Sequence, residues 1–225
     1  MILPFVHPST FLLAGPTGSG KTYFVSRILK ERLITPFPTR IIWVYSEWQP
    51  AYELLRICLN WIEFIKGPIS PKLYENILAS QRNLLVLDDQ MTETGKTSQD
   101  LSKLFVQGSH HKNLSVIYLV QNLFDKGKQH RTVSLNSHYT IIFKNPRDNI
   151  QPGVLGRQMF PHKWKEFVEA YNDATSKSYG YIVLDFRQET EENLRVRTNI
   201  FPSDSENTEI YLIGRDTNAN KKSSV

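Results

Sequence analysis

Short apolar runs rich in β-branched residues recur along the first two thirds of the chain, and helix-like stretches lie between them. This alternation is typical of β-α-β units and predicts a parallel sheet with helices on both faces. Continuous apolar runs, such as residues 84–87, fit strands that are buried on both sides. The predicted strands are Phe11–Ala14, Arg40–Tyr45, Ile62–Ile65, Leu84–Leu87, Ser115–Val120 and Tyr139–Phe143.

The last third of the chain has a different pattern. Apolar and aromatic residues between Trp164 and Tyr171 recur at helical spacing and predict an amphipathic helix. Two apolar segments follow, Gly180–Phe186 and Leu194–Phe201, joined by an acidic stretch at residues 189–193. We expect these segments to form a β-hairpin that extends one edge of the sheet.

A chain of 225 residues is long enough for one large domain. We expect residues 1–160 to form its core and residues 161–213 to form the helix and β-hairpin extension of that domain. The tail, residues 214–225, is rich in Asn, Lys and Ser and is predicted to be disordered. The single cysteine, Cys58, lies in an apolar stretch and is predicted to be a small buried side chain.

The charge and hydropathy of the chain restrict its partners only loosely. Lys and Arg number 27 against 22 Asp and Glu, a net charge of +5 that is compatible with a polyanionic partner without requiring one. No apolar run approaches the ~20 residues that are needed to cross a bilayer, so we expect no membrane partner.

A glycine-rich segment between the strand Phe11–Ala14 and a predicted helix, Tyr23–Leu33, matches a phosphate-binding loop. Its glycines allow the backbone to wrap with N–H groups pointing inward, and the helix N-terminus adds to this anion site. Lys21 would place its charge on the β- and γ-phosphates of ATP, and the Thr22 hydroxyl would ligate Mg²⁺. The loop consists of Gly15, Pro16, Thr17, Gly18, Ser19, Gly20, Lys21 and Thr22.

Two carboxylates, Asp88 and Asp89, directly follow the apolar run Leu84–Leu87. A buried strand would deliver Asp88 to the carboxyl edge of the sheet, where it can hold Mg²⁺ together with Thr22. Asp89 takes the position at which many ATPases carry a glutamate that activates water, although its side chain is one methylene shorter. The alternative for this pair is a solvated turn.

Further candidates follow the next two strands. Gln121, directly after the strand Ser115–Val120, is a candidate sensor of the γ-phosphate, with hydrogen bonding to loop backbone as the alternative. Among three later arginines, Arg147 is our first candidate for a cation that reaches the γ-phosphate of a neighbouring subunit, and Arg131 is the second. The third is Arg157, and surface ion pairing is the alternative for each of them.

A cationic, glycine-bearing segment, Asp125–Arg131, follows the strand that ends at Val120. We predict a loop there that touches the phosphates of a nucleic acid, with a solvated surface loop as the alternative.

Together these motifs resemble those of the FtsK/HerA-type packaging ATPases, most closely those of Polinton/Maverick elements and adintovirus-like double-stranded DNA viruses, relatives of the poxvirus packaging ATPase. The resemblance covers residues 5 to 202. The Gln121-Asn122 and Asn145–Asp148 blocks make it specific. The matching stretches are His7-Pro8, Gly15–Thr22, Leu84–Asp89, Val120–Phe124, Arg131–Asn136, Phe143–Asp148, Arg157–Pro161 and Arg197–Pro202.

The resemblance implies a P-loop NTPase of the RecA-like type that hydrolyses ATP and moves double-stranded DNA into a viral capsid. It places the family's phosphate-loop Lys and Thr on Lys21 and Thr22, the Walker B Asp on Asp88 and the polar sensor on Gln121. The usual catalytic Glu of the superfamily is Asp89 here. It also implies a homo-oligomeric ring, pentamer or hexamer, that contacts viral capsid proteins inside an infected cell, in the nucleus or the cytoplasm, or in the virion.

Two other functions remain open from the sequence. A small-molecule kinase can also be built on a phosphate loop, but it would need an arginine-bearing lid over its acceptor, and no clear lid is evident. A weakly hydrolysing nucleotide-binding scaffold at a capsid vertex is the second alternative, and Asp89 is the residue that favours it. An assay in which water is the only acceptor separates the kinase from the ATPase.

Overall fold

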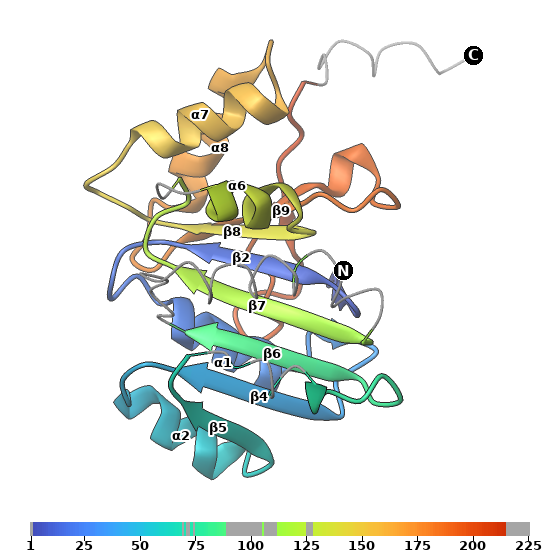
Figure 1. Cartoon of the computed structure of the whole chain (residues 1–225). Coiled ribbons are helices and arrows are strands. Elements are labelled where there is room, and N and C mark those ends of the chain that lie inside the picture. The colour runs from blue at the N-terminus through green and yellow to red at the C-terminus, as the bar shows by residue number, and fades with distance from the viewer. Residues whose placement is uncertain are drawn as a thin grey trace.

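The computed structural model describes residues 2–68, 70, 73, 75–88, 105, 112–124 and 128–214, with backbone alone at 128–130. Its centre is a nine-stranded sheet in the order β11-β10-β9-β8-β2-β7-β6-β4-β5 (Figure 1). The strands of this sheet are β2 (Thr10–Ala14), β4 (Arg40–Tyr45), β5 (Ile62–Lys66), β6 (Asn83–Asp88), β7 (Leu114–Val120), β8 (Tyr139–Phe143), β9 (Tyr181–Asp185), β10 (Val196–Thr198) and β11 (Glu209–Ile210). Two short strands, β1 (Phe5–Val6) and β3 (Ile34–Thr35), pair separately.

The strands from β8 to β5 in this order are all parallel, and β9, β10 and β11 are antiparallel to their neighbours. The six strands that the apolar runs predict match β2, β4, β5, β6, β7 and β8, with bounds that differ by one residue at most. The predicted C-terminal hairpin is formed by β9 and β10, and it extends the sheet beyond β8. The predicted α/β fold with a mostly parallel sheet is therefore confirmed.

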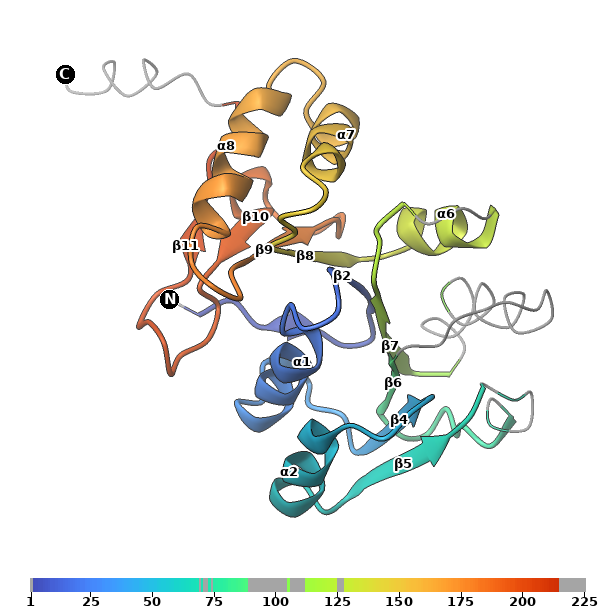
Figure 2. The same cartoon turned by 90° about the vertical axis from the view of Figure 1, so that its left-hand side faces the viewer.

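Helices cover both faces of the sheet because its strands alternate apolar side chains between two cores. Phe11 and Leu13 of β2 pack on the face covered by α1 and α2, whereas Leu12 and Ala14 pack on the face covered by α6, α7 and α8. Figure 2 shows α1 and α2 on one side of the sheet and α6 on the other. The helices are α1 (Lys21–Lys30), α2 (Pro50–Cys58), α6 (Lys128–Leu135), α7 (Ile150–Met159), α8 (Trp164–Ala174) and the 3₁₀ turn η2 (Glu192–Leu194).

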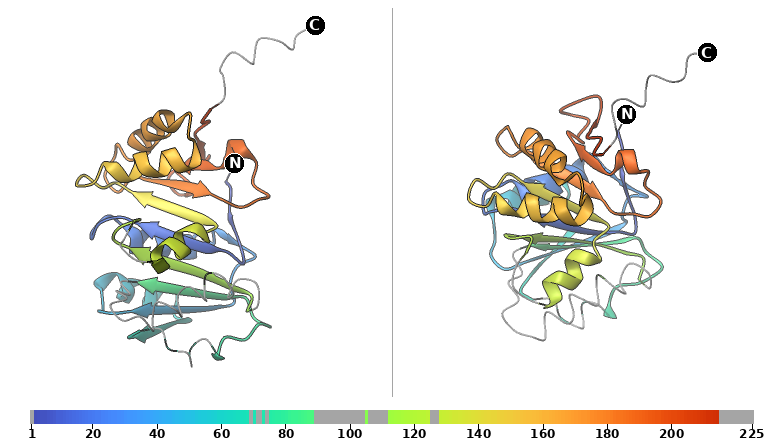
Figure 3. Two further views of the ribbon diagram at one scale, coloured as in Figure 1. Left: turned by 45° about the horizontal axis from the view of Figure 1, so that its top comes forward. Right: turned by 90° about the horizontal axis from the view of Figure 1, so that it is seen from above.

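The predicted amphipathic helix is α8, which begins at Trp164 and buries Phe167, Ala170 and Tyr171. It packs against α7 and contacts β9. Figure 3 shows α7 and α8 lying together over the end of the sheet that holds β8 and β9. None of the helices among the described residues is long and apolar enough to cross a bilayer.

Two predictions about local structure are wrong. Cys58 is exposed at the end of α2, since the apolar residues around it, Leu54 and Ile57, also face outward. The segment Asp125–Arg131 is not a loop throughout, because α6 begins at Lys128 and holds Arg131 on its exposed side. Residues 125–127, and the tail beyond Gly214, lie outside the described residues.

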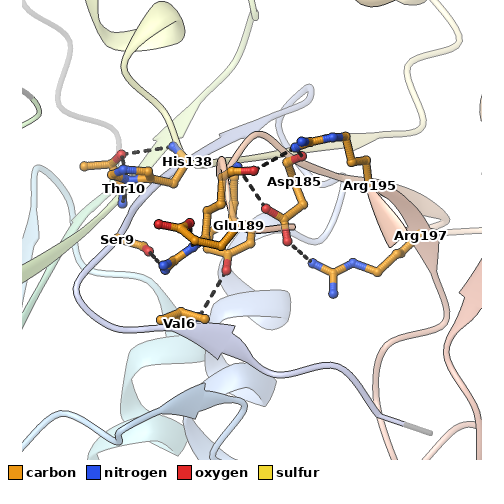
Figure 4. Close-up of polar contacts among 10 residues, drawn as sticks. Val6, Ser9, Thr10, His138, Asp185, Glu189, Arg195 and Arg197 are labelled. Carbon is orange, nitrogen blue, oxygen red and sulfur yellow. Dashed lines mark hydrogen bonds and ion pairs between the residues drawn. The ribbon is translucent and has the colours of Figure 1, made fainter. Parts of the chain in front are cut away.

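A buried ion pair and the hydrogen bonds around it join the two strands of the C-terminal hairpin. Arg197 of β10 and Asp185 of β9 form an ion pair at 2.9 Å, and both side chains are at least 95% buried. The backbone N–H of Arg187 donates to Asp185 Oδ1, and the Arg195 guanidinium donates to the Asp185 carbonyl oxygen. Figure 4 shows these contacts converging on Asp185.

The same cluster reaches the N-terminal segment. The Arg187 guanidinium donates to Ser9 Oγ at 3.1 Å, and the Val6 N–H donates to the Tyr139 hydroxyl at 3.1 Å. Burial lowers the pKa of the Arg197 guanidinium, and the Asp185 charge acts in the opposite direction. Within the described structure Arg197 Nε has no hydrogen-bond partner, so Asp185 provides the main compensation for this buried cation.

We predict that Asp185→Asn destabilises the fold by about 3–5 kcal/mol, because it leaves the Arg197 charge buried without its carboxylate. Chemical denaturation followed by circular dichroism measures this change. The matched control is Glu192→Gln, which removes an exposed ion pair with Arg195 and should cost less than about 1 kcal/mol. Equal stability of the two variants would show that the hairpin does not depend on the buried pair.

Candidate nucleotide-binding site

The phosphate-binding loop lies between the end of β2 and the start of α1, as the sequence predicts. Gly18 and Gly20 have φ values of +78° and +99°, which glycine adopts without steric cost. The Ser19 N–H donates to the Pro16 carbonyl oxygen at 3.1 Å, and the Gly15 N–H donates to the Val120 carbonyl oxygen of β7 at 3.2 Å. The loop is therefore closed on itself and attached to the neighbouring strand.

The N-terminus of α1 suits a negatively charged ligand. Helix N-termini expose backbone N–H groups and carry a partial positive charge, and the first turn of α1 contains no acidic side chain that would neutralise it. Inside the loop, Ser19 Oγ is buried and has no hydrogen-bond partner among the described residues. An unsatisfied buried hydroxyl is costly, so this one fits an acceptor such as a phosphate oxygen.

The ammonium group of Lys21 is held over the loop. Its Nζ donates to the carbonyl oxygen of Gly15 at 2.6 Å and to that of Pro16 at 3.0 Å. These bonds keep a positive charge at the mouth of the loop, next to the N–H groups of α1. The loop thus offers a phosphate group both a side-chain cation and backbone donors.

Asp88, the last residue of β6, contacts Thr22 at the end of the loop, although one strand separates β6 from β2. β7 separates β6 from β2, and Asp88 is 4% exposed at the carboxyl edge of the sheet. The Thr22 hydroxyl donates to Asp88 Oδ2 at 3.1 Å. The structure therefore brings together the two residues that the sequence proposes as Mg²⁺ ligands.

A cavity of about 280 Å³ joins the loop to these groups and is lined by Lys21, Thr22, Asp88 and Gln121. Gln121 directly follows β7 and is exposed, and no hydrogen bond to its side-chain amide occurs in the part of the chain that the structure describes. Arg147 does not line the cavity and lies in an exposed turn after β8, where its backbone N–H donates to Asn145 Oδ1 at 3.1 Å. Asp89 lies outside the described residues.

Sequence reasoning missed Tyr52, which completes the surroundings of Asp88. Its hydroxyl donates to Asp88 Oδ2 at 2.7 Å, the same oxygen that accepts the bond from Thr22. Tyr52 lies on α2, is fully buried, and packs among Trp43, Tyr45 and other aromatic rings. Two hydroxyl donors to one carboxylate oxygen restrict rotation of the carboxylate.

The donor set fits ATP with Mg²⁺. Mg²⁺ prefers oxygen ligands and is usually held by one or two carboxylates together with substrate phosphates, which here would be Asp88, the Thr22 hydroxyl and the nucleotide. Bound there, the ion would neutralise charge on the phosphate oxygens during phosphoryl transfer. The chain's own residues would supply the remaining parts: the loop would bind the phosphates, Lys21 would add a positive charge, and the Tyr52 hydroxyl bond would orient Asp88.

Among known proteins, the chain is similar only to solved structures. No protein-family model matches the chain. No curated protein matches it either. The genome packaging NTPase B204 from Sulfolobus turreted icosahedral virus 2, in complex with ATP-gammaS, is 16% identical over 91% of this chain and 96% of its own, with a TM-score of 0.47. B204, the DNA-packaging ATPase from Sulfolobus turreted icosahedral virus, is 13% identical over 91% and 97%, with a TM-score of 0.48.

We predict that Tyr52→Phe weakens Mg²⁺-dependent nucleotide binding. The carboxylate loses the donor that orients it, and removal of such outer partners of metal ligands usually costs about 10–100-fold in metal affinity. Titration of a fluorescent ATP analogue at a series of Mg²⁺ concentrations should show a half-saturating Mg²⁺ concentration about tenfold higher.

The matched control is Tyr45→Phe, which changes a ring of the same aromatic cluster with no hydrogen bond from its hydroxyl among the described residues. Tyr45→Phe should leave the Mg²⁺ dependence unchanged. An equal shift in both variants would assign the effect to packing of the aromatic cluster and not to the hydroxyl of Tyr52.

Proposed function

We propose that the chain is an ATPase that hydrolyses ATP with Mg²⁺ at the carboxyl edge of its sheet. One observation carries this proposal: the hydrogen bond between Thr22 of the phosphate-binding loop and the buried Asp88. It joins a loop built for phosphates to a carboxylate suited to a metal ion, and phosphoryl transfer needs both.

In this reaction water attacks the γ-phosphorus, the bond to the β-γ bridging oxygen breaks, and ADP, phosphate and a proton are released. Lys21 and the α1 N-terminus bind the phosphates and stabilise charge in the transition state. Gln121, which lines the same cavity, is suited to orient the water through its amide. We assign the activation of water to Asp89 on the sequence pattern.

We further propose that hydrolysis drives double-stranded DNA into a viral capsid, with the protein acting as a homo-oligomeric ring inside an infected cell. The Gln121-Asn122 and Asn145–Asp148 blocks, which resemble those of FtsK/HerA-type packaging ATPases, support this proposal. A net charge of +5 is compatible with such a polyanionic partner.

The surroundings of the three candidate arginines favour Arg147 as the residue that acts on a neighbouring subunit. Arg147 is exposed, and its side chain has no ion pair or hydrogen bond within the described residues. Arg157 instead lies over the ring of Trp164, with 4.9 Å between the guanidinium carbon and the ring centroid. Arg131 is exposed on α6 and remains the second candidate.

We predict that the purified protein releases phosphate from ATP with water as the only acceptor, and that long duplex DNA increases the rate. Lys21→Ala should reduce turnover by roughly 10²–10³-fold, because it removes a preorganised cation from the phosphates. Phosphate release with and without DNA measures both effects. Near-normal turnover of Lys21→Ala would contradict the site, and a need for a small-molecule acceptor would indicate a kinase.

We predict that Arg147→Ala subunits bind ATP normally but lose most of their hydrolysis. If Arg147 acts on the neighbouring subunit, a mixture with Lys21→Ala subunits should recover part of the activity at mixed interfaces. Mixing the two variants at several ratios and measuring phosphate release tests this, and Arg157→Ala is the matched control. Full DNA-stimulated turnover by a monomer would contradict the arrangement.

A further inference from the structure

A second and larger cavity, of about 590 Å³, lies directly beside the phosphate-binding loop. It shares Gly20 and Tyr23 with the smaller cavity at Lys21 and Asp88. Phe24 and Arg27 of α1 and Phe143 of β8 also line it. Most of its walls come from the C-terminal extension, chiefly the turn between α8 and β9 and the residues that follow β10. Ligand cavities usually measure about 300–1,000 Å³, so this one has the size of a ligand site whereas the smaller cavity falls just below that range.

Unusual backbone conformations cluster at this cavity. In the part of the chain that the structure describes, four residues other than glycine have positive φ, and two of them, Tyr179 and Asn199, line the cavity. Tyr179 has a φ of +60°, which is an outlier for a bulky side chain. Gly180 fixes this turn, because a Cβ there would lie 2.6 Å from the Ala174 carbonyl oxygen. Strain of this kind gathers at functional sites.

The strained turn holds an aromatic ring against the phosphate-binding loop. The ring of Tyr179 lies 3.4 Å from the position that a Cβ of Gly20 would take, and its side chain is still 68% exposed. A large exposed aromatic side chain loses apolar burial, and here it also carries backbone strain. Both costs are explained if the free face of the ring packs against a ligand.

The charges of the cavity suit an uncharged group better than a second phosphate. Two cations, Arg27 and Lys177, face three carboxylates, and Arg27 is already bonded to one of them, Asp204. The other two carboxylates are Asp173 and Glu209. The Asn199 amide, which has both donor and acceptor groups, makes no hydrogen bond within the described residues.

We propose that this cavity binds the nucleoside part of the nucleotide, with the base stacked on Tyr179 and the Asn199 amide bonded to the edge of the base. This inference rests on the proposed ATPase function. The triphosphate would then run from the cavity past Gly20 and Tyr23 to Lys21. The C-terminal extension would thereby become the part of the chain that recognises the base.

Tyr179→Gly tests the stacking role, because glycine accepts the positive φ while removing the ring. Its Kd for ATP should rise by about 5- to 150-fold, the range expected from stacking energies of ~1–3 kcal/mol. Its Kd for inorganic tripolyphosphate, which has no base, should stay unchanged. Its melting temperature should stay equal to that of the wild type or rise. Tyr179→Phe keeps the ring and should bind ATP as the wild type does.

Asn199→Gly tests the amide in the same way, since the backbone conformation is again kept. It should narrow the difference in Kd between ATP and GTP that the wild type shows. The matched control for both substitutions is Trp61→Ala. Trp61 is also an exposed aromatic residue, and it precedes β5, the edge strand at the opposite end of the sheet. Isothermal titration calorimetry with the three ligands gives all of these constants.

The outcomes separate this inference from the function on which it rests. An ATP Kd changed less than twofold in Tyr179→Gly, or equal losses for ATP and tripolyphosphate, would overturn the stacking role. A wild type that does not discriminate between ATP and GTP would overturn the role of Asn199. A wild type that binds neither ATP nor tripolyphosphate would instead overturn the proposed ATPase function.

Discussion

The pairing of β2 with β7 on one side and β8 on the other is the constraint on which the rest of the structure depends. It aligns Ala14, the last residue of β2, with Val120 and Ile142, so β2 and β7 end together and β8 ends one residue later. The Gly15 N–H extends this pairing by one hydrogen bond to the Val120 carbonyl oxygen. The start of the loop is therefore fixed against the end of β7. The pairing of β6 with β7 brings Asp88 to the same edge, opposite Leu119. The distance between Thr22 and Asp88 thus follows from backbone register.

Most of the fold could be predicted from the sequence because the signals are local. Each central strand is a short apolar run, and the phosphate-binding loop is a continuous motif between a strand and a helix. The helix α6 was missed for a physical reason. Its first residues, 128–131, are all polar, and Val133 is buried while Leu135 is 74% exposed, so the segment lacks the apolar stripe that marks a helix.

The parts of the site that could not be predicted depend on contacts between distant segments. Tyr52 reads as an ordinary core aromatic, and its hydrogen bond to Asp88 arises only because β4 pairs with β6 and places α2 above that strand's end. The left-handed backbone of Tyr179 has no sequence signal either, since tyrosine is not a residue that favours positive φ. Only the neighbouring Gly180, which the tight turn requires, marks the position in the sequence.

The antiparallel direction of β9 explains how the C-terminal extension can take part in the site. Because β9 runs against β8, its first residue, Tyr181, pairs with Phe143 at the carboxyl edge of the sheet, and its last, Asp185, pairs with Tyr139 at the opposite edge. The turn that precedes β9 therefore reaches the phosphate-binding loop, while the Asp185–Arg197 pair anchors the same strand at the far end. A parallel strand in this place would have put Tyr179 at the wrong edge. The strand β9 thus carries a structural anchor at one end and, at the other, a wall of the cavity proposed for the nucleoside.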